Sequence, residues 1–258
     1  MVVKTKAVIF DIDGTAIDSP VQKVATSRLV QAVRSAEKYY YLCAATGRAW
    51  PYAETVIKSM SLQDPCIVSS GTKICNPVTG EVLWQCNIDA EDVQVALAIM
   101  RETPEYMSLY NDYTEEDYLH GGVSPVDLQV SGSVFFLELK HIPQAIAPSI
   151  GAKLATIDGI ASSVMMSQFP EKMDIHITNK KATKEHAVTE LLHILKLEKE
   201  SSVGVGDNFN DIHIFNSVGY KVAMANSVPE LIAMADQTIG NVGDDGFAAY
   251  LEGLASHE

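Results

Sequence analysis

The chain has 258 residues, enough for one large domain or two smaller ones, and 47% of them are hydrophobic, as in ordinary globular proteins. Its net charge of −14 argues against nucleic acid and anionic membranes as partners, because both are bound through basic surfaces. The apolar runs are too short to span a membrane, the first residues do not resemble a secretory signal, and the four cysteines lack metal-ligand spacing. We therefore expect a cytoplasmic protein.

The first predicted strand starts at Val8 and ends in two carboxylates, Asp11 and Asp13, which are followed by Gly14-Thr15. Its apolar, β-branched residues are typical of a buried parallel strand. Ligands of open α/β sheets bind beyond the carboxyl ends of such strands. Two carboxylates placed there repel each other, and a hard cation such as Mg²⁺ would relieve the repulsion. The alternative is an ordinary Asp-Gly turn without chemistry.

Helices and strands then alternate. Between a predicted strand and a predicted helix lies Thr46-Gly47-Arg48, where a hydroxyl and the free amides of a helix start can hold a phosphate together. A plain strand-to-helix turn explains these three residues equally well. The periodicity predicts helices over 22–37 and 51–60, strands over 39–45, 66–69 and 81–88, and a hairpin turn over 76–80.

The pattern changes between about residues 87 and 178, which we predict to form a separate small module with its own core. Residues 111–133 have no clear periodicity and read as a long polar loop, which contains Tyr118 and His120. The module is predicted to contain helices over 90–101 and 142–154 and strands over 106–110, 134–139, 161–166 and 173–178.

The first pattern returns near residue 182. Thr183 is a suitable N-cap, and Lys184 stands at the first position of a predicted helix, where a cation is unfavourable unless an anion lies nearby. An ordinary solvated lysine is the alternative. A Gly-rich strand over 203–206 then ends in Asp207-Asn208-Phe209-Asn210-Asp211, so a second strand delivers carboxylates at its carboxyl end. The remaining elements are predicted as helices over 211–217, 228–235 and 247–254 and a strand over 221–225.

Taken together and in this order, these segments resemble the haloacid dehalogenase (HAD) superfamily of phosphotransferases, specifically its Cof-like phosphatases with a type II cap. The matching motifs are Asp11-Ile12-Asp13-Gly14-Thr15, Thr46-Gly47-Arg48, Lys184 and Gly206-Asp207-Asn208-Phe209-Asn210-Asp211; Val222–Ser227 and Asp245-Gly246 also match. The resemblance implies an α/β fold with a Rossmann-like parallel-sheet core, built from residues 1–86 and 179–258, and an inserted α+β cap over 87–178. Ser70 replaces the usual Asn before Gly71, and Glu185 replaces a common Gly.

The resemblance also implies a mechanism. Asp11 would be the nucleophile that forms an aspartyl-phosphate, and Asp13 would be the general acid and base. Thr15 would pin the loop. For Arg48, a phosphate or cap contact and a surface role stay open, and Tyr118 and His120 are either selectivity residues or part of a surface loop. Mg²⁺ would be held by Asp11, Asp13, Asp207 and Asp211, and the phosphoryl oxygens by Thr46, Gly47, Lys184 and Asn210.

The expected activity is the Mg²⁺-dependent hydrolysis of a small phosphorylated metabolite, for example a sugar phosphate, under a cap that excludes water. Two alternatives stay open: a phosphomutase of the same superfamily, and a non-catalytic protein that binds a phosphometabolite. The sequence indicates neither the metabolite nor the oligomeric state.

Overall fold

The computed structural model describes residues 4–19 and 22–256. These residues form two compact units. The first contains the chain up to Arg48, Ala53–Trp84 and the chain from Lys184 onward; the second contains Ala49–Tyr52 and Gln85–Thr183.

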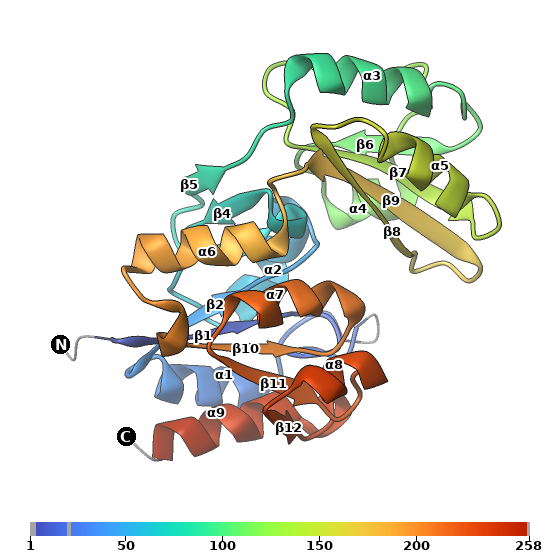
Figure 1. The fold of residues 1–258 in the computed structure, drawn as a ribbon. Coiled ribbons are helices and arrows are strands. Elements are labelled where there is room, and N and C mark those ends of the chain that lie inside the picture. Colours follow the sequence, from blue (N-terminus) through green and yellow to red (C-terminus); the bar gives the residue numbers. More distant parts are fainter. Residues whose placement is uncertain (1–3, 20–21, 257–258) are drawn as a thin grey trace. The chain divides into compact units, whose positions relative to one another are not determined.

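A parallel five-stranded sheet, in the order β12-β11-β10-β1-β2, forms the centre of the first unit (Figure 1). Its strands are β1 (Lys6–Phe10), β2 (Tyr40–Ala44), β10 (Ser202–Gly206), β11 (Tyr220–Met224) and β12 (Gln237–Ile239). A second, three-stranded sheet consists of β3 (Cys66–Val68), β4 (Lys73–Cys75) and β5 (Val82–Gln85). The helices are α1 (Ser27–Ala36), α2 (Trp50–Ser59), α6 (Lys184–Leu195), α7 (Ile212–Ser217), α8 (Pro229–Met234) and α9 (Gly246–Ser256).

Helices cover both faces of this sheet. Successive residues of β1 point to opposite faces, and because both sets are largely apolar, each face is buried under helices. On one side Ile9 packs against Val188 and Leu191 of α6 and against α7. On the other side Phe10 contacts Phe247 of α9, with the ring centroids 4.7 Å apart, and α9 packs on α1. Burying each of these large side chains stabilises the fold by roughly 1.5–3 kcal/mol.

The second unit is an antiparallel sheet in the order β6-β7-β9-β8 with helices on it. Helices α3 and α5 share an apolar core with one face of the sheet, while the aromatic residues around α4 pack near the other face. The elements are α3 (Ala90–Met100), β6 (Met107–Tyr110), α4 (Glu115–His120), β7 (Phe136–Pro143), α5 (Ala147–Leu154), β8 (Ile160–Met166) and β9 (Lys172–Asn179). The predicted fold class, a parallel-sheet α/β core with an α+β insertion, is confirmed.

Several predicted element bounds are wrong for identifiable reasons. Helix α1 begins at Ser27 rather than near residue 22, because the side chain of Thr26 caps it by accepting a hydrogen bond from the Leu29 amide. Helix α5 begins only at Ala147, since β7 continues through an irregularity after Leu139 to Pro143. Helix α4 and strand β12 were not predicted.

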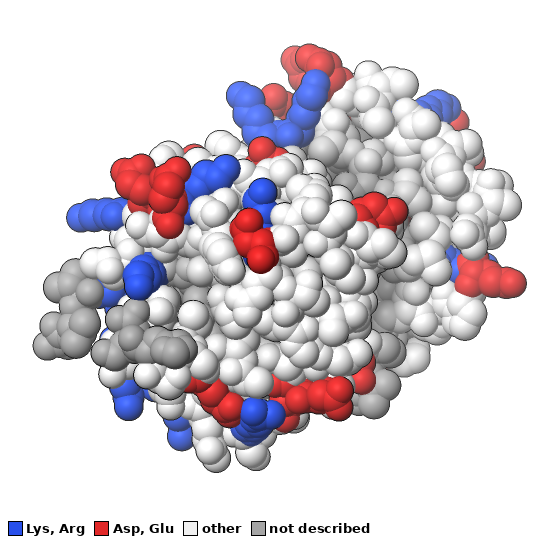
Figure 2. Space-filling model, turned by 60° about the horizontal axis from the view of Figure 1, so that its bottom comes forward, with Lys and Arg blue, Asp and Glu red and all other residues white. Residues whose placement is uncertain are grey.

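The excess of acidic residues is not gathered into one patch on the face that Figure 2 shows, where acidic side chains form several small groups, most of them with basic side chains beside them. Within the described ranges, no helix combines the length and the apolar character that crossing a bilayer requires.

Candidate active site

The candidate site is at the carboxyl ends of β1 and β10, which are neighbours in the sheet. The two strands stay paired beyond Phe10, since the amide of Asp11 donates to the Val205 carbonyl at 3.0 Å. As a consequence, the loop that carries Asp11 and the loop that carries Asp207 leave the sheet side by side. The carboxylates that the sequence predicts after the first strand and those that it predicts after the strand over 203–206 therefore lie at the same edge of the sheet.

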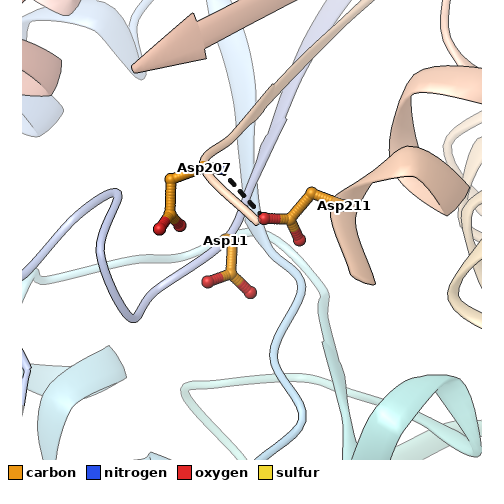
Figure 3. A group of neighbouring side chains, drawn as sticks. All are labelled: Asp11, Asp207 and Asp211. Atoms are coloured by element: carbon orange, nitrogen blue, oxygen red, sulfur yellow. Dashed lines mark hydrogen bonds between the residues drawn. The ribbon is translucent and has the colours of Figure 1, made fainter. Parts of the chain in front are cut away.

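Three carboxylates converge there (Figure 3). One oxygen from each of Asp11, Asp207 and Asp211 lies within 4.8 Å of the other two. The ammonium of Lys184, at the start of α6, donates to Asp11 Oδ1 at 2.7 Å and to Asp211 Oδ1 at 2.9 Å. Lys184, Asp11 and Asp211 are all buried, so their charges interact through protein rather than through water.

Asp211 fixes the shape of its own loop. Its Oδ2 accepts hydrogen bonds from the amides of Asp207 at 3.0 Å and Asn208 at 3.1 Å. A side chain at Gly206 would put its Cβ 2.5 Å from the Asp211 Cβ, so glycine is required for this close approach. With its other oxygen on Lys184, the Asp211 carboxylate serves both as a charge in the cluster and as an anchor for the loop.

The loop that carries Asp11 also packs closely against the loop that carries Asp207. Gly14 has φ +84°, and a Cβ there would lie 2.3 Å from Asp207 Oδ2, so only glycine allows the turn to approach this carboxylate. Thr15, which is buried, donates from Oγ1 to Asp207 Oδ1 at 3.1 Å. Thr15 thus links the two loops, in agreement with the expectation that it pins the first one.

The electrostatics of the cluster favour a bound cation. Burial, followed by the charge of Asp211, raises the pKa of Asp11 well above its ordinary value, and the same two causes raise the pKa of Asp207 to about 7. Three carboxylates against one ammonium leave two negative charges, which a single divalent cation would balance. Carboxylate oxygens are also the donors that hard divalent cations prefer. The residues present therefore fit a divalent metal.

Asp13 is not one of these three carboxylates, but its charge also raises the pKa of Asp11 and of Asp207, and it is paired with Arg48. The guanidinium contacts both carboxylate oxygens, from Nε at 3.0 Å and from Nη2, and Nη2 also donates to the Ser19 hydroxyl at 3.2 Å. Such a two-point contact holds a carboxylate in one orientation. The sequence left open a phosphate contact, a cap contact or a surface role for Arg48, and did not propose this pairing.

The other expected phosphate-binding residues lie on the loops after β2 and β10. Thr46 is buried, and its Oγ1 accepts from the Arg48 amide at 3.2 Å, while Gly47 follows it in the turn. Asn210 is exposed, in the 3₁₀ turn Phe209–Asp211. Ser70, where the family usually has Asn, has φ 58° and ψ 24°, a left-handed conformation that Asn adopts more readily than Ser.

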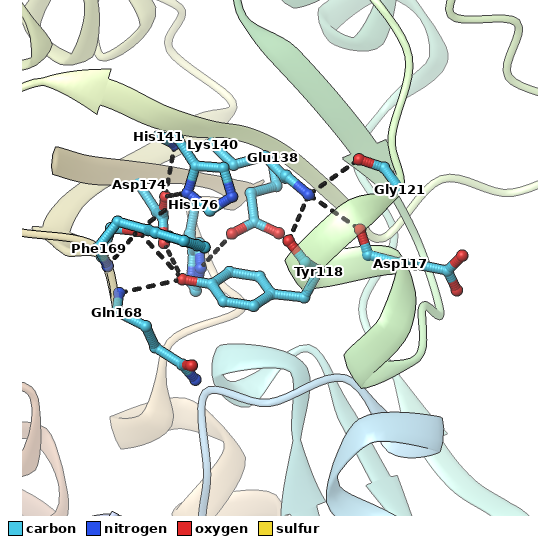
Figure 4. Close-up of polar contacts among 11 residues, drawn as sticks. Asp117, Tyr118, Gly121, Glu138, Lys140, His141, Gln168, Phe169, Asp174 and His176 are labelled. Carbon is cyan, nitrogen blue, oxygen red and sulfur yellow. Dashed lines mark hydrogen bonds and ion pairs between the residues drawn. The ribbon is translucent and has the colours of Figure 1, made fainter. Parts of the chain in front are cut away.

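In the second unit, the interpretation of residues 111–133 as a surface loop is wrong for Tyr118. This residue is buried on α4, and its hydroxyl donates to Asp174 at 2.6 Å (Figure 4). Lys140 of β7 donates to the carbonyls of Asp117 and Gly121, at 2.9 and 3.0 Å, and to that of Tyr118, so it caps the end of α4. His120 is exposed.

Comparison with known proteins identifies the family. The model of the haloacid dehalogenase-like hydrolases matches residues 8–120 and 150–251, well over half of the chain. An HMP-PP phosphatase of Serratia proteamaculans is 23% identical over 264 residues, which cover 94% of this chain and 93% of that protein. A phosphoglycolate phosphatase of Saccharolobus solfataricus is 36% identical over 84 residues, but the match spans only 33% of this chain and 37% of that protein.

Among solved structures, a sugar phosphatase of HAD subclass IIB superposes with a TM-score of 0.75 at 22% identity, covering 97% of this chain and all of the other. At this identity the likeness shows a shared fold. The resemblance to the Cof-like phosphatases is confirmed by the family match together with these relatives. The chain belongs to the haloacid dehalogenase-like hydrolases.

Proposed function

We propose that this HAD-type hydrolase removes the phosphoryl group from small phosphorylated metabolites, with Asp11 as the nucleophile. The observation that carries the proposal is the buried contact of Lys184 with Asp11 and Asp211, beside Asp207. A carboxylate that attacks a phosphate monoester meets an anion, so positive charge must lie at the site of attack. Lys184 supplies one such charge.

A magnesium ion would supply the rest of the positive charge, acting as a Lewis acid on the phosphoryl oxygens. We propose that Asp11, Asp207 and the backbone carbonyl of Asp13 hold this ion. Asp211 would complete its surroundings, directly or through water, because Mg²⁺ usually keeps several waters. The net charge of the cluster supports a divalent ion, and the donor set supports magnesium over soft metals.

The proposed reaction has two steps. An oxygen of Asp11 attacks phosphorus, the ester bond to the leaving oxygen breaks, and Asp13 protonates that oxygen. In the second step Asp13 takes a proton from water, the water oxygen attacks phosphorus, and the bond to Asp11 breaks to release inorganic phosphate. In this structure Arg48 contacts both oxygens of Asp13, so one of these contacts would open when Asp13 takes up this role.

The phosphoryl oxygens would be held by Thr46, Gly47, Lys184 and Asn210. Lys184 has three N–H donors, and in the described part of the chain two of them are used by Asp11 and Asp211, which leaves one for the substrate. The buried Thr46 hydroxyl lies in the turn before α2, where it can bind an anion together with nearby amides.

The relatives support small phosphorylated metabolites as the substrate class, since their names give HMP-PP, phosphoglycolate and sugar phosphates as substrates. These substrates differ from one another, so the proposal extends to the class and not to one compound. We propose that residues 87–178 are the cap and select the substrate within this class. We also propose a cytoplasmic location, which the free, mostly buried cysteines support.

Replacing the nucleophile gives the first test. We expect Asp11→Asn to lower kcat for inorganic phosphate release by at least about 10³-fold while the circular dichroism spectrum stays unchanged, because an amide does not attack phosphorus. Asp158→Asn makes the same chemical change at a fully exposed position and should leave kcat unchanged. A panel of phosphorylated metabolites supplies the substrates, and phosphate release separates a phosphatase from a phosphomutase. Substantial turnover by Asp11→Asn would disprove the assignment.

The metal requirement gives the second test. We expect EDTA to abolish phosphate release and added Mg²⁺ to restore it, whereas Ca²⁺ should restore little activity, because it takes more ligands at longer distances. Phosphate release would be measured across a Mg²⁺ titration. Full activity of the chelated enzyme would contradict the requirement for a cation.

The raised pKa of Asp207 predicts how the stability of the metal-free protein depends on pH. The pKa rises from 3.8 to about 7 on folding, so the protonated form favours the folded state, and this stability is lost as the pH rises from about 4 towards 7. In EDTA, the Tm of Asp207→Asn should match that of the wild type near pH 4 and exceed it increasingly towards pH 7. A Tm difference that does not change with pH would show that the Asp207 carboxylate is not destabilised by its surroundings.

A further inference from the structure

The segment after β11, Asn226–Val228, contacts both of the loops that carry the acidic cluster. Asn226 donates from Nδ2 to the Gly14 carbonyl at 2.8 Å. Its Oδ1 accepts from the Val242 amide at 3.0 Å, so the side-chain amide is held in one orientation. Through Asn226, the turn that follows Asp11 and Asp13 is tied to the segment after β11.

The next two residues bind the second loop. Ser227 donates from its hydroxyl to the Gly206 carbonyl at 3.2 Å, and the amide of Val228 donates to the Asp207 carbonyl at 2.9 Å. Three consecutive residues therefore donate hydrogen bonds to the main chain of both loops that carry the cluster.

These hydrogen bonds matter because the two loops carry like charges that repel each other. Asp11, Asp207 and Asp211 carry like charges a few ångströms apart, and their mutual repulsion acts to separate the loops. The neutral hydrogen bonds from Asn226–Val228 oppose this separation without adding charge. Partners behind metal ligands commonly set metal affinity in this way, and their loss costs about 10–100-fold in affinity.

We propose that Asn226 and Ser227 are positioning residues that hold the loops of Asp11 and Asp207 at the spacing a divalent cation needs. This inference rests on the proposed function, because it assumes that the cluster binds the ion. Asn226 is exposed, so removing its side chain leaves no cavity in the core. A change in metal affinity should therefore appear without a loss of folding.

The test is the binding of Mg²⁺ to the full chain after treatment with EDTA, measured by isothermal titration calorimetry. We expect Asn226→Ala to raise the Kd for Mg²⁺ about tenfold. Asn216→Ala is the matched control, because Asn216 is exposed as well and Lys199 contacts its backbone carbonyl rather than its side chain. The control should stay within about twofold of the wild type.

Conservative variants separate positioning from general stability. Asn226→Asp keeps the acceptor for Val242 but loses the donor to Gly14, and its added charge by itself would favour cation binding, so a raised Kd would report lost positioning. Ser227→Ala should raise the Kd, and Ser227→Thr, which keeps the hydroxyl, should restore it. In phosphate-release assays, Asn226→Ala and Ser227→Ala should raise the half-saturating Mg²⁺ concentration. Their KM for the phosphate ester at saturating Mg²⁺ should stay the same as that of the wild type.

Two failures can be told apart. If the wild type binds Mg²⁺ and releases phosphate, but Asn226→Ala and Ser227→Ala bind Mg²⁺ as tightly as the wild type, the positioning role is wrong and the proposed function stands. If the wild type itself binds no Mg²⁺ and releases no phosphate, the proposed function is wrong, and the positioning role falls with it.

Discussion

The contact of one buried ammonium, that of Lys184, with Asp11 and Asp211 is the interaction on which the candidate site depends. Without it, three carboxylates would share a poorly solvated space with no positive charge in contact. With it, the site still keeps an excess of two negative charges when all three carboxylates are ionised, and burial together with the charge of Asp211 raises the pKa of Asp207. We propose that a divalent cation balances this charge and offsets the negative charge of a phosphorylated substrate.

The fold holds these three like charges close together through backbone geometry rather than through additional positive charges. Parallel pairing of β1 with β10 brings the two loops to one edge of the sheet, and glycines at positions 14 and 206 let the carboxylates approach closely. Lys184 starts α6, where the helix dipole alone would disfavour a cation, so the two carboxylates compensate for an unfavourable position. Asn226–Val228, the segment after β11, then donates hydrogen bonds to both loops.

Much of this arrangement could be predicted because each functional segment directly follows an apolar strand or starts a helix, and these positions have strong local signals. The pairing of Arg48 with Asp13 could not, since it depends on where two long side chains meet in space. Helix α4 was missed because its six residues show no apolar period. It forms through the capping box of Thr114 and Asp117 and through Lys140, a residue distant in sequence. The three residues of β12 are too few to give a periodic signal.

The most direct test of the account is a crystal structure of the protein grown with Mg²⁺ and orthovanadate, an analogue of the phosphoryl group in transfer. We expect one magnesium ion bonded to oxygens of Asp11 and Asp207, and vanadium bonded to the remaining carboxylate oxygen of Asp11, with Lys184 in contact with the vanadate. A magnesium ion bound elsewhere, or vanadate bound away from Asp11, would contradict this expectation.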